Sequence, residues 1–173
     1  NKKNISPDVL KEIINICGDS LYNLKNEIDK ICLMTEEKNI KIENINFDSS
    51  FSRRRKRWEL MSSLGARDLK KSIKLGKSII DSSETMISLI FPMAALFQEL
   101  LFVKMNNGTF IKSSSYIPLS TFLKNNISNY ANNYTVEETK VAIKELKKIE
   151  IRQKTTNTDD ESELINFIYN AIG

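Results

Sequence analysis

The chain has 173 residues, of which 40% are hydrophobic and 28% charged, so it can bury the core of one compact domain or two small ones. Its 5 glycines and 3 prolines are too few for collagen or a turn-rich β sandwich, and the net charge is only +4. Histidine is absent, which excludes a Ser-His-Asp triad and any histidine-ligated metal site. We therefore predict an all-α protein.

The first forty residues predict two helices. A capping serine, a proline and an aspartate at residues 6–8 are typical of a helix start, and Gly18 is typical of a helix end. A second helix follows over about residues 21–32. Isoleucines at 40, 42 and 45 then indicate a short extended piece or a single helical turn. Each helix carries one cysteine at an apolar position, and we expect two buried thiols in a reducing cytosol: Cys17 and Cys32.

The excess positive charge lies in the middle of the chain. Residues 51–112 carry 12 basic and 5 acidic side chains, whereas the segments before and after are slightly acidic. A run of five cations precedes an amphipathic helix that contains Trp58 and stops at Gly65. This run could bind phosphates, or it could be a solvated linker and first helical turn, where cations oppose the helix dipole. Its members are Arg53, Arg54, Arg55, Lys56 and Arg57.

The next helices are marked by caps and by apolar periodicity. Asp68 begins a helix that reaches about residue 80, and residues 84–107 predict the central, most buried helix. Pro92 is expected to kink or split it. Polar residues inside this segment, among them Glu99 and Lys104, argue against a membrane span, and the N-terminus does not predict a signal peptide.

The last third of the chain predicts three more helices. They cover about residues 118–130, 135–152 and 164–172, and Thr135 with Glu138 forms a capping box. The result is about eight helices in two groups, with a boundary near residue 48. The missing initiator methionine suggests a piece of a longer protein.

Other candidate features have simpler explanations. Residues 65–72 lack the second glycine of a phosphate-binding P-loop, because Lys70 stands there, so we expect an ordinary turn. Trp58 is in register with apolar neighbours and is expected in the core. The acidic residues 159–163 complement a helix dipole. Five aromatic residues are expected to pack rather than to form a stacking surface: Phe110, Tyr116, Phe122, Tyr130 and Tyr134. We expect no catalytic, cofactor or metal site.

The order of motifs resembles that of a known family. Residues 5–10, 18–21 and 24–31 resemble the lid of the delta subunit of bacterial DNA polymerase III, and residues 58–60 and 68–72 resemble the opening helices of its collar. The resemblance implies an incomplete AAA+-type lid at residues 1–48 and a helical-bundle collar at residues 49–173. Leu21 stands where ATPase subunits of this family carry a nucleotide-sensing arginine, so the resemblance implies an inactive lid.

The resemblance also implies partners. The family is a non-ATPase part of the clamp loader, which places the sliding clamp on primed DNA as part of the polymerase holoenzyme, a nucleotidyltransferase in the cytoplasm. The collar is expected to bind the delta-prime and gamma/tau subunits, with an interface in residues 84–107 and 135–172. The clamp would be bound by an N-terminal domain outside this chain. No membrane is expected to take part.

Two alternatives remain. One is a free-standing helical nucleic-acid-binding module that uses the basic run 53–57 and four further lysines: Lys70, Lys71, Lys74 and Lys77. The other is an enzyme, which would need a cofactor or substrate pocket.

Overall fold

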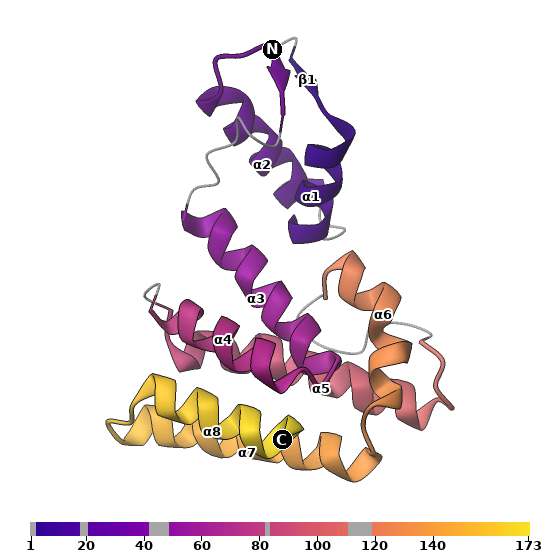
Figure 1. Ribbon diagram of the computed structural model, residues 1–173, viewed down its shortest axis with the longest axis vertical. Coiled ribbons are helices and arrows are strands. Elements are labelled where there is room, and N and C mark those ends of the chain that lie inside the picture. The colour runs from indigo at the N-terminus through magenta and orange to yellow at the C-terminus, as the bar shows by residue number, and fades with distance from the viewer. Residues whose placement is uncertain (1–2, 18–20, 42–48, 82–83, 111–118) are drawn as a thin grey trace.

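The computed structural model describes residues 3–17, 21–41, 49–81, 84–110 and 119–173 (Figure 1). Eight helices and two short strands lie in this described part, so the predicted all-α fold is confirmed. The predictions for Gly18, Ile42, Ile45, Tyr116 and the side chain of Cys17 lie outside the described residues.

The N-terminal part is a helical hairpin tied at one end by two strands. Helices α1 (Pro7–Cys17) and α2 (Leu21–Met34) have nearly the predicted bounds, and β1 (Asn4–Ile5) pairs in parallel with β2 (Asn39–Ile40). Their buried contacts form a small cluster of Val9, Ile13, Ile31 and Ile40. Cys32 is partly buried and packs against this cluster near the end of α2, so the prediction of a buried thiol is met only in part there.

Helix α3 (Ser49–Gly65) begins earlier than the sequence indicated. The basic run 53–57 therefore lies in the second and third turns of α3 and not in a linker or first turn, which corrects that expectation. Arginine and lysine are good helix formers, so the run extends the helix instead of preceding it. After a short turn, α4 (Leu69–Ile80) begins as predicted at Asp68, whose side chain accepts a hydrogen bond from the Lys71 backbone N–H at 2.9 Å.

Helix α5 (Met86–Met105) is one continuous helix, so Pro92 does not split it, and a kink at Pro92 stays a prediction. Pro92 is the seventh residue of α5 and removes one backbone hydrogen bond inside the helix, but buried residues on both sides of it, Leu89, Ile90 and Met93, hold the helix in the core. By length and composition α5 could cross a membrane, but 61% of its most apolar window is buried inside the protein.

The remaining helices are α6 (Thr121–Asn132), α7 (Val136–Thr155) and α8 (Asp160–Ile172). Helix α6 starts three residues later than predicted, because Ser120 is its N-cap and accepts a hydrogen bond from the Leu123 N–H at 3.3 Å. The predicted capping box of Thr135 and Glu138 is confirmed. Helices α7 and α8 lie side by side, with α5 packed on α7 and α4 on α8 (Figure 1).

Residues of the six helices from α3 through α8 form one large hydrophobic cluster. At its centre Phe97 of α5 makes edge-to-face contacts with Tyr134 and Phe167, with ring centroids 5.7 Å and 5.8 Å apart. Trp58, Phe110 and Tyr130 pack against this cluster, as their positions predicted. Phe122 is 48% exposed on α6, so the prediction that it would pack is wrong. The two clusters take their residues from either side of position 48, and the domain boundary there stays a prediction because residues 42–48 lie outside the described part.

Candidate functional site

Helix α5 has a second apolar face that the core does not cover. Its inner face is buried, but several residues at helical spacing on the opposite side remain accessible. Phe91 is 57% exposed and Met105 is 70% exposed. We call this face the α5 stripe; its members are Ile87, Phe91, Gln98, Leu101, Phe102 and Met105. Gln98 separates the two apolar residues of the first half, Ile87 and Phe91, from the apolar residues of the second half, of which Leu101 and Phe102 are partly buried.

The α5 stripe is held rigidly from behind. Leu96, Phe97 and Leu100 on the inner face are fully buried, so the helix cannot turn to hide its outer face without emptying the core. Burying a large apolar side chain is worth about 1.5–3 kcal/mol relative to full exposure, and proportionally less for one already half covered. Covering Phe91 and Met105 together would therefore contribute strongly to the stability of an assembly.

The outer side of α7 differs from the α5 stripe. Four of its lysines each lie beside a glutamate of the same helix, at 2.5–3.2 Å: Lys140, Lys147, Lys148 and Lys154. Such pairs, three or four residues apart, suit a solvated helix surface. The predicted interface in residues 84–107 therefore has an apolar surface to support it, whereas the outer side of α7 mixes these ion pairs with two exposed apolar residues, Val141 and Ile151.

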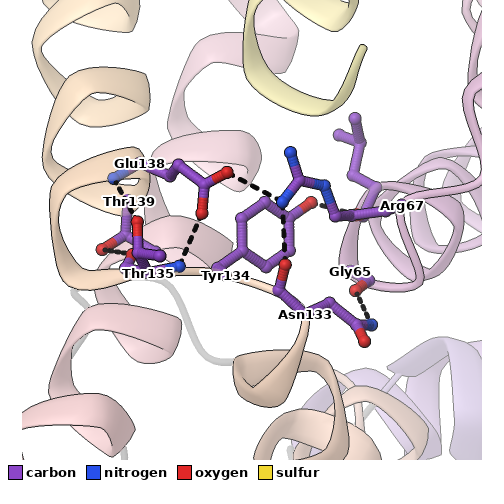
Figure 2. A network of polar contacts seen from close by, with 8 residues as sticks. Gly65, Arg67, Asn133, Tyr134, Thr135, Glu138 and Thr139 are labelled. Carbon is purple, nitrogen blue, oxygen red and sulfur yellow. Dashed lines mark hydrogen bonds and ion pairs between the residues drawn. The ribbon is translucent and has the colours of Figure 1, made fainter.

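A polar network joins the α3–α4 turn to the α6–α7 turn. Arg67, which has a φ of 55°, donates from Nη1 to the Asn133 carbonyl and to the Glu138 carboxylate, both at 2.9 Å. Its guanidinium lies over the Tyr134 ring, 5.0 Å from the centroid (Figure 2). Asn133 Nδ2 donates to the Gly65 carbonyl at 3.0 Å. The P-loop-like segment 65–72 is thus an interhelix turn, as expected, and Arg67 is bound within the protein.

Two groups of this network have shifted pKa values. The Thr135 backbone N–H, and then Arg67, lower the pKa of Glu138 to about 2. Burial raises the pKa of Tyr134, whose hydroxyl stays protonated and donates to the Leu64 carbonyl. At neutral pH the Glu138 carboxylate is therefore ionised beside the Arg67 guanidinium, and the Tyr134 hydroxyl is neutral.

Two side chains of the predicted basic site contact other residues of the protein. Lys56 Nζ donates to Ser78 Oγ at 3.0 Å, and Arg57 forms an ion pair with Glu84. The backbone of α3 includes Arg53, Arg54 and Arg55, whose side chains lie outside the described residues. Arg57 is consequently neutralised, whereas Lys56 keeps its positive charge beside a hydroxyl on α4.

Leu21 is the first residue of α2 and is 82% exposed. An apolar side chain cannot hydrogen-bond a phosphate, so this position offers no nucleotide contact. Its assignment as a degenerate nucleotide sensor stays a prediction.

The acidic residues at the start of α8 serve structural roles. Asp159 is the N-cap and accepts a hydrogen bond from the Ser162 N–H at 2.8 Å, and Glu163 pairs with Arg152 at 2.7 Å. A surface cavity of about 430 Å³ between α7 and α8 is lined by this pair and by Glu145, which also contacts Arg152 at 3.4 Å. Within the described residues, no three Asp, Glu or Cys side chains gather as metal ligands.

Sequence reasoning missed the α5 stripe. Its spacing of three and four residues is readable in the sequence, but α5 is apolar on nearly all sides, so periodicity could not separate the covered face from the uncovered one.

The fold has a likeness among known structures. No family model matches the sequence, and no curated protein matches it. The fold is similar to that of the Bacillus subtilis DNA clamp loader delta protein, with a TM-score of 0.76 and 19% sequence identity. The match covers 99% of this chain and 52% of that protein, so the chain spans about half the length of its structural neighbour. The chain therefore has a clamp-loader-like, all-α fold.

Proposed function

We propose that this chain is the lid and collar part of a delta-type, non-ATPase clamp-loader subunit, with the lid at residues 1–48 and the collar at residues 49–173. The observation that carries the proposal is the fold: a TM-score of 0.76 over 99% of the chain, against a clamp loader delta protein. The order of lid and collar motifs in the sequence supports the same assignment.

In this proposal the chain serves assembly. The α5 stripe is the surface that meets a neighbouring collar, because it is apolar, rigidly backed and uncovered. The neighbours are the delta-prime and gamma/tau subunits. A domain outside this chain binds the sliding clamp, and the full complex binds primed DNA. The complex works in the cytoplasm during replication. Leu21 suits a lid that does not sense nucleotide.

The test is gel filtration with light scattering of this chain mixed with delta-prime and ATPase subunits from the same source. We expect co-elution as a larger assembly. Phe91→Ser should abolish co-elution, while Phe122→Ser should leave it intact, since Phe122 is a similarly exposed phenylalanine on α6 (48%). Separate peaks for the unmodified chain would contradict the assembly role, and equal effects of both variants would contradict the α5 stripe.

The alternative of a free-standing nucleic-acid module that relies on the basic run is less well supported. Arg57, one of the five cations of the run, is paired with Glu84 and so is not available to a phosphate. Replacing Arg53, Arg54, Arg55 and Arg57 by alanine distinguishes the two functions. A module would lose DNA binding and stay folded, whereas a collar would keep its co-elution.

A further inference from the structure

Helix α4 presents a row of lysines to solvent. Lys70, Lys71 and Lys74 are all exposed, and Lys74 lies one helical turn from each of the other two. Lys56 of α3 extends the row, because its Nζ is held 3.0 Å from Ser78 Oγ, and Ser78 lies one turn beyond Lys74 on α4. Four ammonium groups from two helices therefore follow one line. We call this surface the α4 ridge.

The charges of the α4 ridge are not neutralised within the described residues. Lys70, Lys71 and Lys74 have no ion pair there, unlike the lysines of α7, which lie beside glutamates. Two acidic groups around α4 are engaged away from the ridge lysines. Asp68 caps the helix, and Glu161 pairs with Lys77 at 2.9 Å. Asp81, the C-cap residue of α4, follows Ser78 by three positions and so flanks the Lys56 end of the ridge.

Helix stability does not account for this arrangement. Like charges one turn apart destabilise a helix by about 0.2–0.5 kcal/mol per pair, so the spacing of Lys70, Lys71 and Lys74 opposes folding slightly. On α7, by contrast, lysines lie beside glutamates of the same helix, an arrangement that stabilises a helix. A binding role explains why α4 lacks such glutamates.

The α4 ridge is rigid and purely polar. Ser72 Oγ donates to Ser63 Oγ at 2.9 Å, and Gly76 lies so close to α8 that an added Cβ would meet Leu164 Cδ2 at 3.0 Å. These contacts fix α4 between α3 and α8. Large exposed apolar side chains occur on other helices but not on α4. A single-sign row without apolar anchors suits a row of phosphates better than a protein segment.

We propose that the α4 ridge binds the phosphate backbone of nucleic acid, without reading its sequence. Lysines act as point charges toward phosphate oxygens and displace condensed counterions, so this contact is electrostatic and salt-dependent. The ridge lies on α4 and α3, separate from the α5 stripe, so the inference holds whether or not the assembly role does.

The test measures fluorescence anisotropy of labelled duplex and single-stranded DNA of mixed sequence, titrated with this chain. With four phosphate contacts the slope of log affinity against log salt is about −3.6, which corresponds to about a 100-fold loss between about 50 and 200 mM salt. The triple variant Lys70→Gln, Lys71→Gln, Lys74→Gln should bind at least about 10-fold more weakly in low salt, with a slope near −0.9.

The matched control is the triple variant Lys140→Gln, Lys147→Gln, Lys148→Gln, which removes the same charge from exposed positions on α7 and should leave DNA affinity nearly unchanged. Replacing the three ridge lysines by arginine should retain binding. This result would mean that the glutamine variant binds DNA more weakly because it lost charge, and not because it is misfolded. Three results would overturn the proposal: no binding at about 50 mM salt, equal losses in both glutamine variants, or competition by polyglutamate as effective as by DNA.

Discussion

Arg67 and Glu138 form an ion pair at 2.9 Å that joins the α3–α4 turn to the first turn of α7. The two residues are 71 positions apart in the sequence. The Glu138 carboxylate also accepts a hydrogen bond from the Thr135 backbone N–H in the capping box of α7. It therefore stabilises the start of α7 and also connects α7 to the α3–α4 turn.

Replacing Arg67 by alanine should lower the free energy of unfolding by about 1–2 kcal/mol. The variant loses a partly exposed ion pair, a cation–π contact with Tyr134 and a hydrogen bond to the Asn133 carbonyl. Arg67→Gly loses the same contacts but relieves the positive φ of 55°, so it should be less destabilised than Arg67→Ala. Urea unfolding of both variants measures the difference, and an equal loss would show that the backbone there is unstrained.

The pH dependence of stability should include a contribution from Glu138. Its pKa in the folded protein is lowered from 4.5 to about 2, so the stabilisation is fully present above 4.5 and is lost as the pH falls toward 2. The variant Glu138→Gln should therefore lose less stability than the unmodified chain between about pH 5 and pH 3. Urea unfolding at each pH tests this, and parallel curves for the two proteins would contradict it.

Gly65→Ala should destabilise the protein although alanine favours helices. A Cβ at Gly65 would lie 2.6 Å from Tyr130 Cδ2, and Tyr130 is itself held by a 2.8 Å hydrogen bond between its hydroxyl and Ser62 Oγ. Relieving this overlap should cost about 1–3 kcal/mol. In a double-mutant cycle, Tyr130→Ala should remove most of that cost. Additive effects of the two substitutions would mean that the overlap is relieved in another way.

The two faces of α5 should respond differently to truncation. Phe97→Ala removes a fully buried ring that contacts Tyr134 and Phe167, and should lower the free energy of unfolding by about 3–5 kcal/mol. Phe91→Ala, on the α5 stripe, should change it by less than about 1 kcal/mol in the isolated chain. Thermal unfolding of both variants gives the comparison. A large loss for Phe91→Ala would show that its exposed face already has a partner.

Local signals predicted much of this fold. Caps are short-range hydrogen bonds between residues three apart, so Asp68 and Thr135 could be placed from the sequence alone. The isoleucines from Ile40 indicated an extended piece as one of two alternatives, but its pairing with β1, 35 positions away, was missed because a local pattern does not identify the partner strand. The start of α3 was misplaced because its first turns, Ser49 onward, lack apolar periodicity.

The candidate surfaces were less predictable than the elements. A basic run reads as a site in the sequence, yet the structure pairs Arg57 with Glu84, 27 residues away. Conversely, Lys56 joins the lysines of α4 only because α3 and α4 fold against each other. Which charges remain free depends on tertiary contacts, and those are not encoded in local spacing.

The hydrogen bonds between the α3–α4 turn and the α6–α7 turn should affect the kinetics of folding. Among the described residues, five hydrogen bonds connect residues 62–67 with residues 130–138, at separations of 66 to 71 positions. Closing one loop of that length costs about 4 kcal/mol of chain entropy, and the closure brings all five bonds within reach at once. The bonds should therefore form and break together, so that substitutions at Ser62, Arg67 and Asn133 alter the folding rate as one group.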